Sequence, residues 1–196
     1  MSGPSGVIIL TRHGEPALSR KVKLTAAQYR VWWARYELGG LKPGQTPPAD
    51  LIAIAQKTPR VFASTRLRSI ESTQALIGDR PFETDQGLIE SPLPPPAFPP
   101  WVTFSPRHWG FIARVWWWFF NVYDPGEESR ALAEARALAA ARRLIELTAK
   151  GEDAQVVAHG FFNTLIGRAL KQLGWRCVRN EGWRYWSTKI YQQPGG

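Results

Sequence analysis

The stretch Val7-Ile8-Ile9-Leu10-Thr11-Arg12-His13-Gly14-Glu15 joins a short apolar run to a cluster of polar residues. Short runs of β-branched and aliphatic residues are typical of strands that are buried in a parallel sheet. Residues 155–158 form another such run, and His159 follows it as Arg12 and His13 follow the first. Because ligands bind beyond the carboxyl ends of parallel strands, we expect these polar residues to face one crevice.

Predicted strands and helices alternate along the chain. We expect strands at residues 7–10, 61–63, 155–158 and around 184–191, and helices at 25–38, 49–56, 67–77, 127–150 and 160–173. Thr25 is a suitable N-cap, and the acidic start and basic end of the helix at 127–150 match the helix dipole. The alternation predicts an α/β three-layer sandwich with a mainly parallel central sheet flanked by helices.

Residues 91–123 form a Pro- and Trp-rich insertion in an otherwise single domain, which we expect to span residues 1–196. Six of the ten residues at 91–100 are prolines, which predicts a rigid loop because proline lacks a backbone donor. The apolar run that follows is centred on Trp116–Trp118. We favour a cap helix that buries its aromatic face on the core. Two alternatives are an apolar wall for substrate and an interfacial helix that contacts a membrane surface.

Composition narrows the class of protein without identifying a partner. A formal net charge of +9 fits either a solubilising surface or a field that attracts anions. Cys177 is the only cysteine, so no internal disulfide or cysteine-based metal site is expected. The chain has no recognisable nucleic-acid-reading motif, and its first six residues are too short for a signal peptide. We therefore expect a soluble cytoplasmic protein that does not bind nucleic acid.

Four segments in order along the chain resemble one family, the histidine phosphatase (phosphoglycerate mutase-like) superfamily. Thr11–Glu15 resembles its N-terminal Arg-His-Gly signature, residues 63–73 its second motif, and residues 157–160 its second histidine motif. Residues 88–90 stand where one branch of the family places an acidic proton donor. Together these segments span most of the chain. The resemblance implies a phosphoglycerate mutase-like fold.

The resemblance also assigns roles to individual residues. It implies that His13 is a nucleophile that forms a phosphohistidine, that Glu90 is the proton donor, and that His159 is catalytic and contacts phosphate. Arg12 and Arg68 are the implied phosphate ligands, and Arg68 lies four residues after the serine of the second motif. The family has a leucine where Arg66 stands, and a register shift would make Arg66 the ligand instead. The implied activity is hydrolysis of a phosphorylated small molecule or a phosphoprotein.

These residue types suit that chemistry. A phosphate ester repels nucleophiles, so several cationic donors must converge on it, and arginine matches two oxygens at once. A neutral histidine can then attack and split the displacement into two steps, while one carboxyl acts as acid and then as base. We therefore expect no metal and no cofactor. Glu15, through an arginine partner, and Asn163 are expected to support the site or to contact ligand.

Two alternatives remain open on sequence alone. A phosphoglycerate mutase-type enzyme would return the phosphoryl group to substrate instead of water, and it would use the same residues. A non-catalytic module would bind anions through the basic surface, but it would not need a nucleophile.

Overall fold

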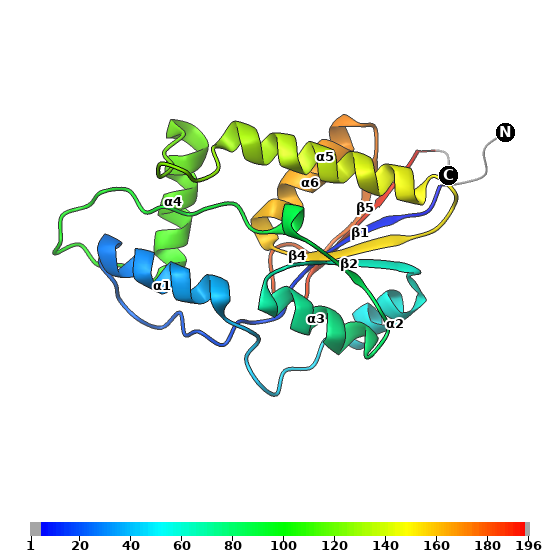
Figure 1. The fold of residues 1–196 in the computed structure, drawn as a ribbon, viewed down its shortest axis with the longest axis horizontal. Coiled ribbons are helices and arrows are strands. Elements are labelled where there is room, and N and C mark those ends of the chain that lie inside the picture. Colours follow the sequence, from blue (N-terminus) through cyan, green and yellow to red (C-terminus); the bar gives the residue numbers. More distant parts are fainter. Residues whose placement is uncertain (1–4, 195–196) are drawn as a thin grey trace.

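The computed structural model describes residues 5–194, and their strands form one six-stranded sheet (Figure 1). The strand order is β3-β2-β4-β1-β6-β5. Strand β6 runs antiparallel to both of its neighbours, and the other paired strands run parallel. The expected mainly parallel α/β fold is confirmed. The strands are β1 (Ile8–Arg12), β2 (Arg60–Ser64), β3 (Glu83–Asp85), β4 (Ala154–Ala158), β5 (Arg176–Asn180) and β6 (Thr188–Gln192).

Helices cover both faces of this sheet. Alternate residues of a strand point to opposite faces, so Val156 packs with α5 and α6 while Val157 packs with α2 and α3. Figure 1 shows the two helix pairs on either side of the sheet, with α1 and α4 beyond one end. The helices are α1 (Ala26–Leu38), α2 (Ala49–Lys57), α3 (Leu67–Ile77), α4 (Pro106–Phe120), α5 (Arg130–Thr148) and α6 (Gly160–Gln172), and a 3-10 turn occupies Gln86–Leu88.

The pairing of β1 with β4 brings the two histidines to the same edge of the sheet. Arg12 lies opposite Ala158 in the parallel register, and the His13 backbone N–H donates to the Ala158 carbonyl at 2.9 Å. His13 and His159 are the next residues of the two strands. Their adjacency therefore follows from strand register.

Side-chain caps mark the starts of both α1 and α5. Thr25 caps α1 through a capping box in which its hydroxyl accepts from the Gln28 backbone N–H at 3.3 Å. Helix α5 begins at Arg130, after the N-cap Ser129, so Glu127 and Glu128 precede it. Its first turn carries no acidic residue. Its last turn carries no basic residue either, so the expected match of charged residues to the dipole of this helix is wrong at both ends.

The insertion packs aromatic side chains in two places. Trp109 of α4 stacks with Tyr29 of α1 in a cluster that also contains Trp32 and Tyr36. Trp117 is fully buried in the main core, and its indole N–H donates to the Glu128 carbonyl at 3.2 Å. The core-packing interpretation of the tryptophan run is confirmed for Trp117. Among residues 5–194, no helix is both long and apolar enough to cross a membrane.

Strands β3 and β5 are the outer strands of the sheet, and no sequence pattern predicted them. Strand β3 is the three-residue sequence Glu-Thr-Asp, and β5 is Arg-Cys-Val-Arg-Asn with largely exposed side chains. Neither contains an apolar run. The strand expected around 184–191 begins only at Thr188, because residues 183–186 form a turn.

Candidate active site

His13 is held with one ring nitrogen available as a nucleophile. Its side chain is almost fully buried, and Nδ1 lies 2.7 Å from the Gly14 carbonyl oxygen. A carbonyl can only accept, so Nδ1 carries the hydrogen and Nε2 presents a lone pair. The Arg68 Nε–H donates to that Nε2 at 3.3 Å. This lone pair therefore faces a cation, and a guanidinium is a group that can also bind phosphoryl oxygens.

His159 lies beside His13 and is oriented by two partners. The two rings are 5.2 Å apart at an angle of 64°. His159 Nδ1 is 3.2 Å from Arg68 Nη2, and Nε2 is 2.9 Å from the Ser64 hydroxyl oxygen. Because a guanidinium only donates, Nδ1 accepts and Nε2 carries the hydrogen. Arg68 therefore fixes the tautomer, and Ser64 at the end of β2 orients the ring of a histidine that follows β4.

Both histidines are neutral at physiological pH. Burial lowers the pKa of His13 well below its usual value, and the nearby Arg68 and Arg12 guanidinium groups lower it further. The pKa of His159 is lowered for the same reasons, with burial first and Arg68 second. Neutrality is the state that an attacking imidazole requires.

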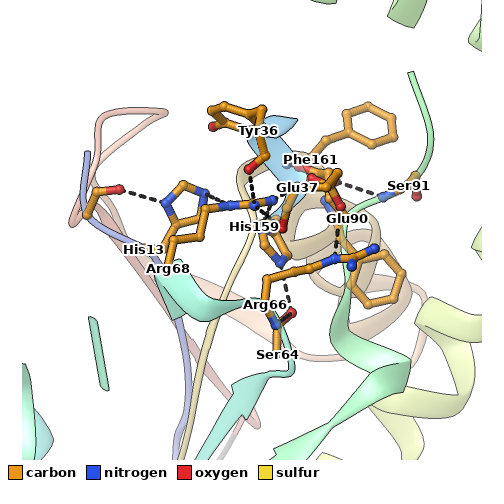
Figure 2. Close-up of polar contacts among 12 residues, drawn as sticks. His13, Tyr36, Glu37, Ser64, Arg66, Arg68, Glu90, Ser91, His159 and Phe161 are labelled. Carbon is orange, nitrogen blue, oxygen red and sulfur yellow. Dashed lines mark hydrogen bonds and ion pairs between the residues drawn. The ribbon is translucent and has the colours of Figure 1, made fainter. Parts of the chain in front are cut away.

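Arg68 joins the two histidines to the end of helix α1. It lies in the first turn of α3 and is fully buried. Besides the histidines, it donates to the backbone carbonyls of Tyr36 at 3.0 Å and Glu37 at 3.3 Å, and to Glu37 Oε1 at 2.7 Å. Figure 2 shows the guanidinium group between both rings and this carboxylate. The helix α1 C-terminus, where carbonyls are unpaired, favours such a cation.

Arg66 contacts neither histidine. Its Nε lies 2.9 Å from Glu37 Oε2, so Glu37 bridges Arg66 and Arg68 (Figure 2). The structure therefore brings Arg68 to the histidines, in the register that places it four residues after Ser64. Glu37 is a site residue that sequence reasoning missed. Nothing in its local sequence distinguishes it from an ordinary exposed helix residue.

Within the described part of the chain, Arg12 forms a hydrogen bond with a neighbouring turn and none with the histidines. Its Nη1 donates to the Trp183 carbonyl, and its guanidinium carbon lies 4.5 Å from the centre of the Tyr185 ring. In residues 5–194, the buried Arg12 Nε has no hydrogen-bond partner. The expected convergence of Arg12, Arg68 and His159 is thus met by Arg68 and His159, with Arg12 beside them.

Glu90 caps the helix that begins after His159. Its carboxylate accepts from the backbone N–H groups of Phe161 at 3.2 Å and Phe162 at 3.0 Å, and Arg114 Nη2 lies 4.0 Å away. The side chain is mostly buried. Figure 2 shows Glu90 on the same side of Arg68 as Glu37, over Arg66. Within residues 5–194, Glu90 forms no hydrogen bond with either histidine.

Glu15 lies on the surface, whereas Asn163 lies inside the protein. Glu15 pairs with Lys42 at 3.6 Å on an exposed loop, so the expected arginine partner is wrong. Lys42 lies close because its backbone N–H donates to the Glu15 carbonyl at 2.9 Å. Asn163 is buried, and its amide donates to the Thr11 carbonyl at 2.9 Å. Asn163 therefore ties α6 to β1 just before the Arg-His-Gly triplet.

A family model described as the histidine phosphatase superfamily (branch 1) matches residues 52–192, more than half of the chain. The chain belongs to the histidine phosphatase superfamily. Arg68, Glu90 and His159 lie inside the matched range, whereas Arg12 and His13 precede it. Comparison with curated protein sequences gives no match.

Solved structures of other proteins share the fold of this superfamily member. Mycobacterial hydrolase 2 has a TM-score of 0.60 and 17% identity, covering 99% of this chain and 85% of its own. Phosphoserine phosphatase from Entamoeba histolytica, in complex with 3-phosphoglyceric acid, has a TM-score of 0.59 and 15% identity. The match covers 94% of this chain and 89% of the phosphatase. Phosphoglycerate mutase from Bacillus anthracis has a TM-score of 0.58 and 19% identity. The match covers 98% of this chain and 91% of the mutase. The fold therefore includes both phosphatases and a mutase.

Two cavities of this superfamily member are lined by neighbours of the histidine pair. One, of about 630 Å³, contains Glu37, Arg66 and Glu90 and is walled by Trp33 and the proline-rich loop. The other, of about 870 Å³, contains Arg12 and Tyr185. Among residues 5–194, no group of three or more histidine, cysteine, aspartate or glutamate side chains is placed to hold a metal ion.

Proposed function

We propose that the chain is a metal-independent phosphatase that hydrolyses a phosphomonoester or a phosphoprotein through a phosphohistidine on His13. One observation carries the proposal. The neutral His13 presents its Nε2 lone pair to the Arg68 guanidinium, which also contacts the neutral His159. A pure anion-binding module would have no use for a histidine held in the nucleophilic tautomer.

The position of Glu37 on Arg68 supports a location for the phosphoryl group. Its carboxylate occupies the outer face of Arg68 at 2.7 Å and also pairs with Arg66 at 2.9 Å. A phosphate monoester carries close to two negative charges and three acceptor oxygens, against one charge and two oxygens for a carboxylate. We propose that the substrate displaces Glu37 from Arg68 and takes up hydrogen bonds from Arg68 and Arg12.

In the first step, His13 Nε2 attacks phosphorus and the bond from phosphorus to the leaving oxygen breaks. Protonated Glu90 transfers its proton to that oxygen, which leaves as the alcohol. Arg68, Arg12 and His159 surround the phosphoryl oxygens as charge builds on them. The products are a phosphohistidine and the Glu90 carboxylate.

In the second step, water attacks the phosphohistidine. Glu90 accepts a proton from the water as its oxygen bonds to phosphorus and the N–P bond breaks. Inorganic phosphate leaves, and His13 and protonated Glu90 are regenerated. Asn163 supports these steps by holding α6 against β1 through the Thr11 carbonyl.

The test is release of inorganic phosphate from a panel of alkyl, sugar and peptide phosphomonoesters, with a chelator present. We expect turnover with at least one class. His13→Ala should lower that turnover by about 10³-fold or more while leaving the protein folded, because the covalent route is lost. A matched substitution at the exposed His108 should leave turnover unchanged.

Two results would change the assignment. A bisphosphate-primed reaction that moves phosphate between positions of one substrate, with little free phosphate, would support the mutase alternative. Phosphate release that persists in His13→Ala, or release that requires an added divalent metal, would contradict the proposed mechanism.

A further inference from the structure

The larger of the two cavities is strongly basic. It has a volume of about 870 Å³ and lies between the loop after β1, the start of α4 and the turn before β6. Its only acidic lining residue is Glu15. Its basic lining residues are Arg12, Arg20, Lys21, Lys42, Arg107 and Arg184.

Most of these positive charges have no protein counter-charge. Within residues 5–194, Glu15 pairs with Lys42, and no carboxylate lies within 4.0 Å of any other basic residue of the cavity. Many arginines elsewhere in the molecule are paired, for example Arg136 with Glu128 at 2.7 Å. A cavity that gathers unpaired cations concentrates positive potential and attracts anions.

Aromatic rings connect this cavity to the histidines. The Tyr185 ring lies 5.9 Å from the His13 ring, 4.5 Å from the Arg12 guanidinium and 5.5 Å from that of Arg20. The Tyr36 ring in turn lies between Arg20, at 5.1 Å, and Arg68, at 4.7 Å. Arginines and tyrosines thus alternate from the phosphoryl site to the cavity, and Arg12 belongs to both.

The second cavity, on the Glu90 side, has the opposite balance. Its charged lining consists of five acidic residues and three basic ones, Glu37, Glu90, Asp124, Glu127 and Glu128 against Arg30, Arg66 and Arg136. An anionic group extending from the phosphoryl site is therefore repelled on this side and attracted on the other. The charges of the two cavities therefore favour one orientation of a charged substrate, with its remote anionic group in the basic cavity.

We propose that the basic cavity binds the remote anionic groups of the substrate, so that preferred substrates are phosphomonoesters whose alcohol carries at least one further phosphate. This inference rests on the proposed function. A second phosphate fits better than a carboxylate, because the Arg107 and Arg184 side chains donate no hydrogen bond within residues 5–194 and an arginine fork matches two phosphate oxygens. The volume suits a small molecule with more than one charged group, and the concave shape suits a small molecule better than a duplex.

The test compares glucose 6-phosphate with glucose 1,6-bisphosphate. We expect the wild type to favour the bisphosphate in kcat/KM, and the triple variant Lys21→Gln, Arg107→Gln, Arg184→Gln to reduce that preference by about tenfold or more. These three side chains are exposed and form no ion pair in the part of the chain described. A control that removes the same charge elsewhere, Lys57→Gln, Arg142→Gln, Lys171→Gln, should retain the preference.

A binding measurement separates this proposal from the proposed function. Calorimetric titration with inorganic tripolyphosphate requires no turnover, and we expect the cavity variant to bind it about tenfold more weakly than the control variant. If no member of the phosphomonoester panel is hydrolysed, the proposed function is contradicted, while the titration still tests whether the cavity binds anions. Equal kcat/KM for the two sugars, an unchanged preference in the cavity variant, or equal tripolyphosphate binding by both variants would overturn the inference.

Discussion

Single residues in this site are predictable where they follow buried strands. His13 and His159 each follow an apolar run, and parallel pairing of β1 with β4 makes them neighbours. The place of Arg68 in the site is predictable from its four-residue spacing to Ser64. Glu37 is different, because it reaches Arg68 only through the docking of α1, which depends on the aromatic cluster between α1 and α4. No local pattern encodes that tertiary contact.

The two arginines of the second motif should differ sharply when replaced. Arg68 contacts both histidines, whereas Arg66 contacts only Glu37 within the site. Arg68→Ala should lower single-turnover phosphorylation of the enzyme by about 10²-fold or more, as loss of a preorganised donor does elsewhere. Arg66→Ala should have a much smaller effect.

Circular dichroism on both variants checks that the fold is retained, because Arg68 is buried and Arg66 is not. A larger loss from Arg66→Ala than from Arg68→Ala would show that the phosphate ligand lies in the other register.

Secondary structure elements are predictable where caps and apolar periodicity agree. Helices α1 and α3 occupy the expected residues, since Thr25 caps one and Gly78 ends the other. Strands β3 and β5 were not predictable, because outer strands need no apolar run and both lack one. The start of α5 was misplaced because Ser129, not an acid before it, is the N-cap, and its hydroxyl accepts from the Leu132 N–H at 3.4 Å.

The tryptophan run of α4 should divide into a structural and a dispensable part. Trp117 is fully buried in the main core, whereas Phe119 and Phe120 are 73% and 66% exposed. Trp117→Ala should lower the free energy of unfolding by about 3–5 kcal/mol. Phe119→Ser should change it by no more than about 0.5 kcal/mol.

Urea unfolding followed by fluorescence measures both changes. Similar losses for the buried and the exposed position would contradict the burial of Trp117. Binding of the wild type to anionic vesicles that is lost when Phe119 and Phe120 are replaced would instead support the interfacial interpretation of this helix.

The whole molecule carries its positive charge unevenly. Salt bridges neutralise many arginines, while unpaired cations line the basic cavity next to Arg12. The net charge of +9 alone did not distinguish a solubilising surface from an anion-attracting field. The distribution of unpaired cations favours an anion-attracting field on one face of the site. This distribution arises only when folding brings distant loops together.

Folding stability should fall in mild acid because of the two buried histidines. Their pKa values are well below the usual 6.5 in the folded protein, whereas in the unfolded chain they return to that value. Below about pH 6.5 the unfolded state therefore binds protons at histidines that stay neutral in the folded state. As a result, the free energy of unfolding decreases as the pH falls. The slope is at most about 1.4 kcal/mol per pH unit for each histidine.

Urea unfolding between about pH 5 and pH 6.5 isolates this effect, because most carboxylates titrate lower. We expect His13→Gln to remove about half of the slope. A wild-type stability that is flat over this range, or an unchanged slope in His13→Gln, would contradict neutral buried histidines.

Trapping the covalent intermediate is the most direct test of the central claim. The enzyme is mixed with a phosphate-labelled substrate that it turns over, quenched rapidly, and the labelled peptide is identified. We expect label on His13 in a linkage that is stable to base and labile to acid, and no label on His13→Ala. Label on a serine, or no labelled protein although the first turnover is resolved, would contradict His13 as the nucleophile.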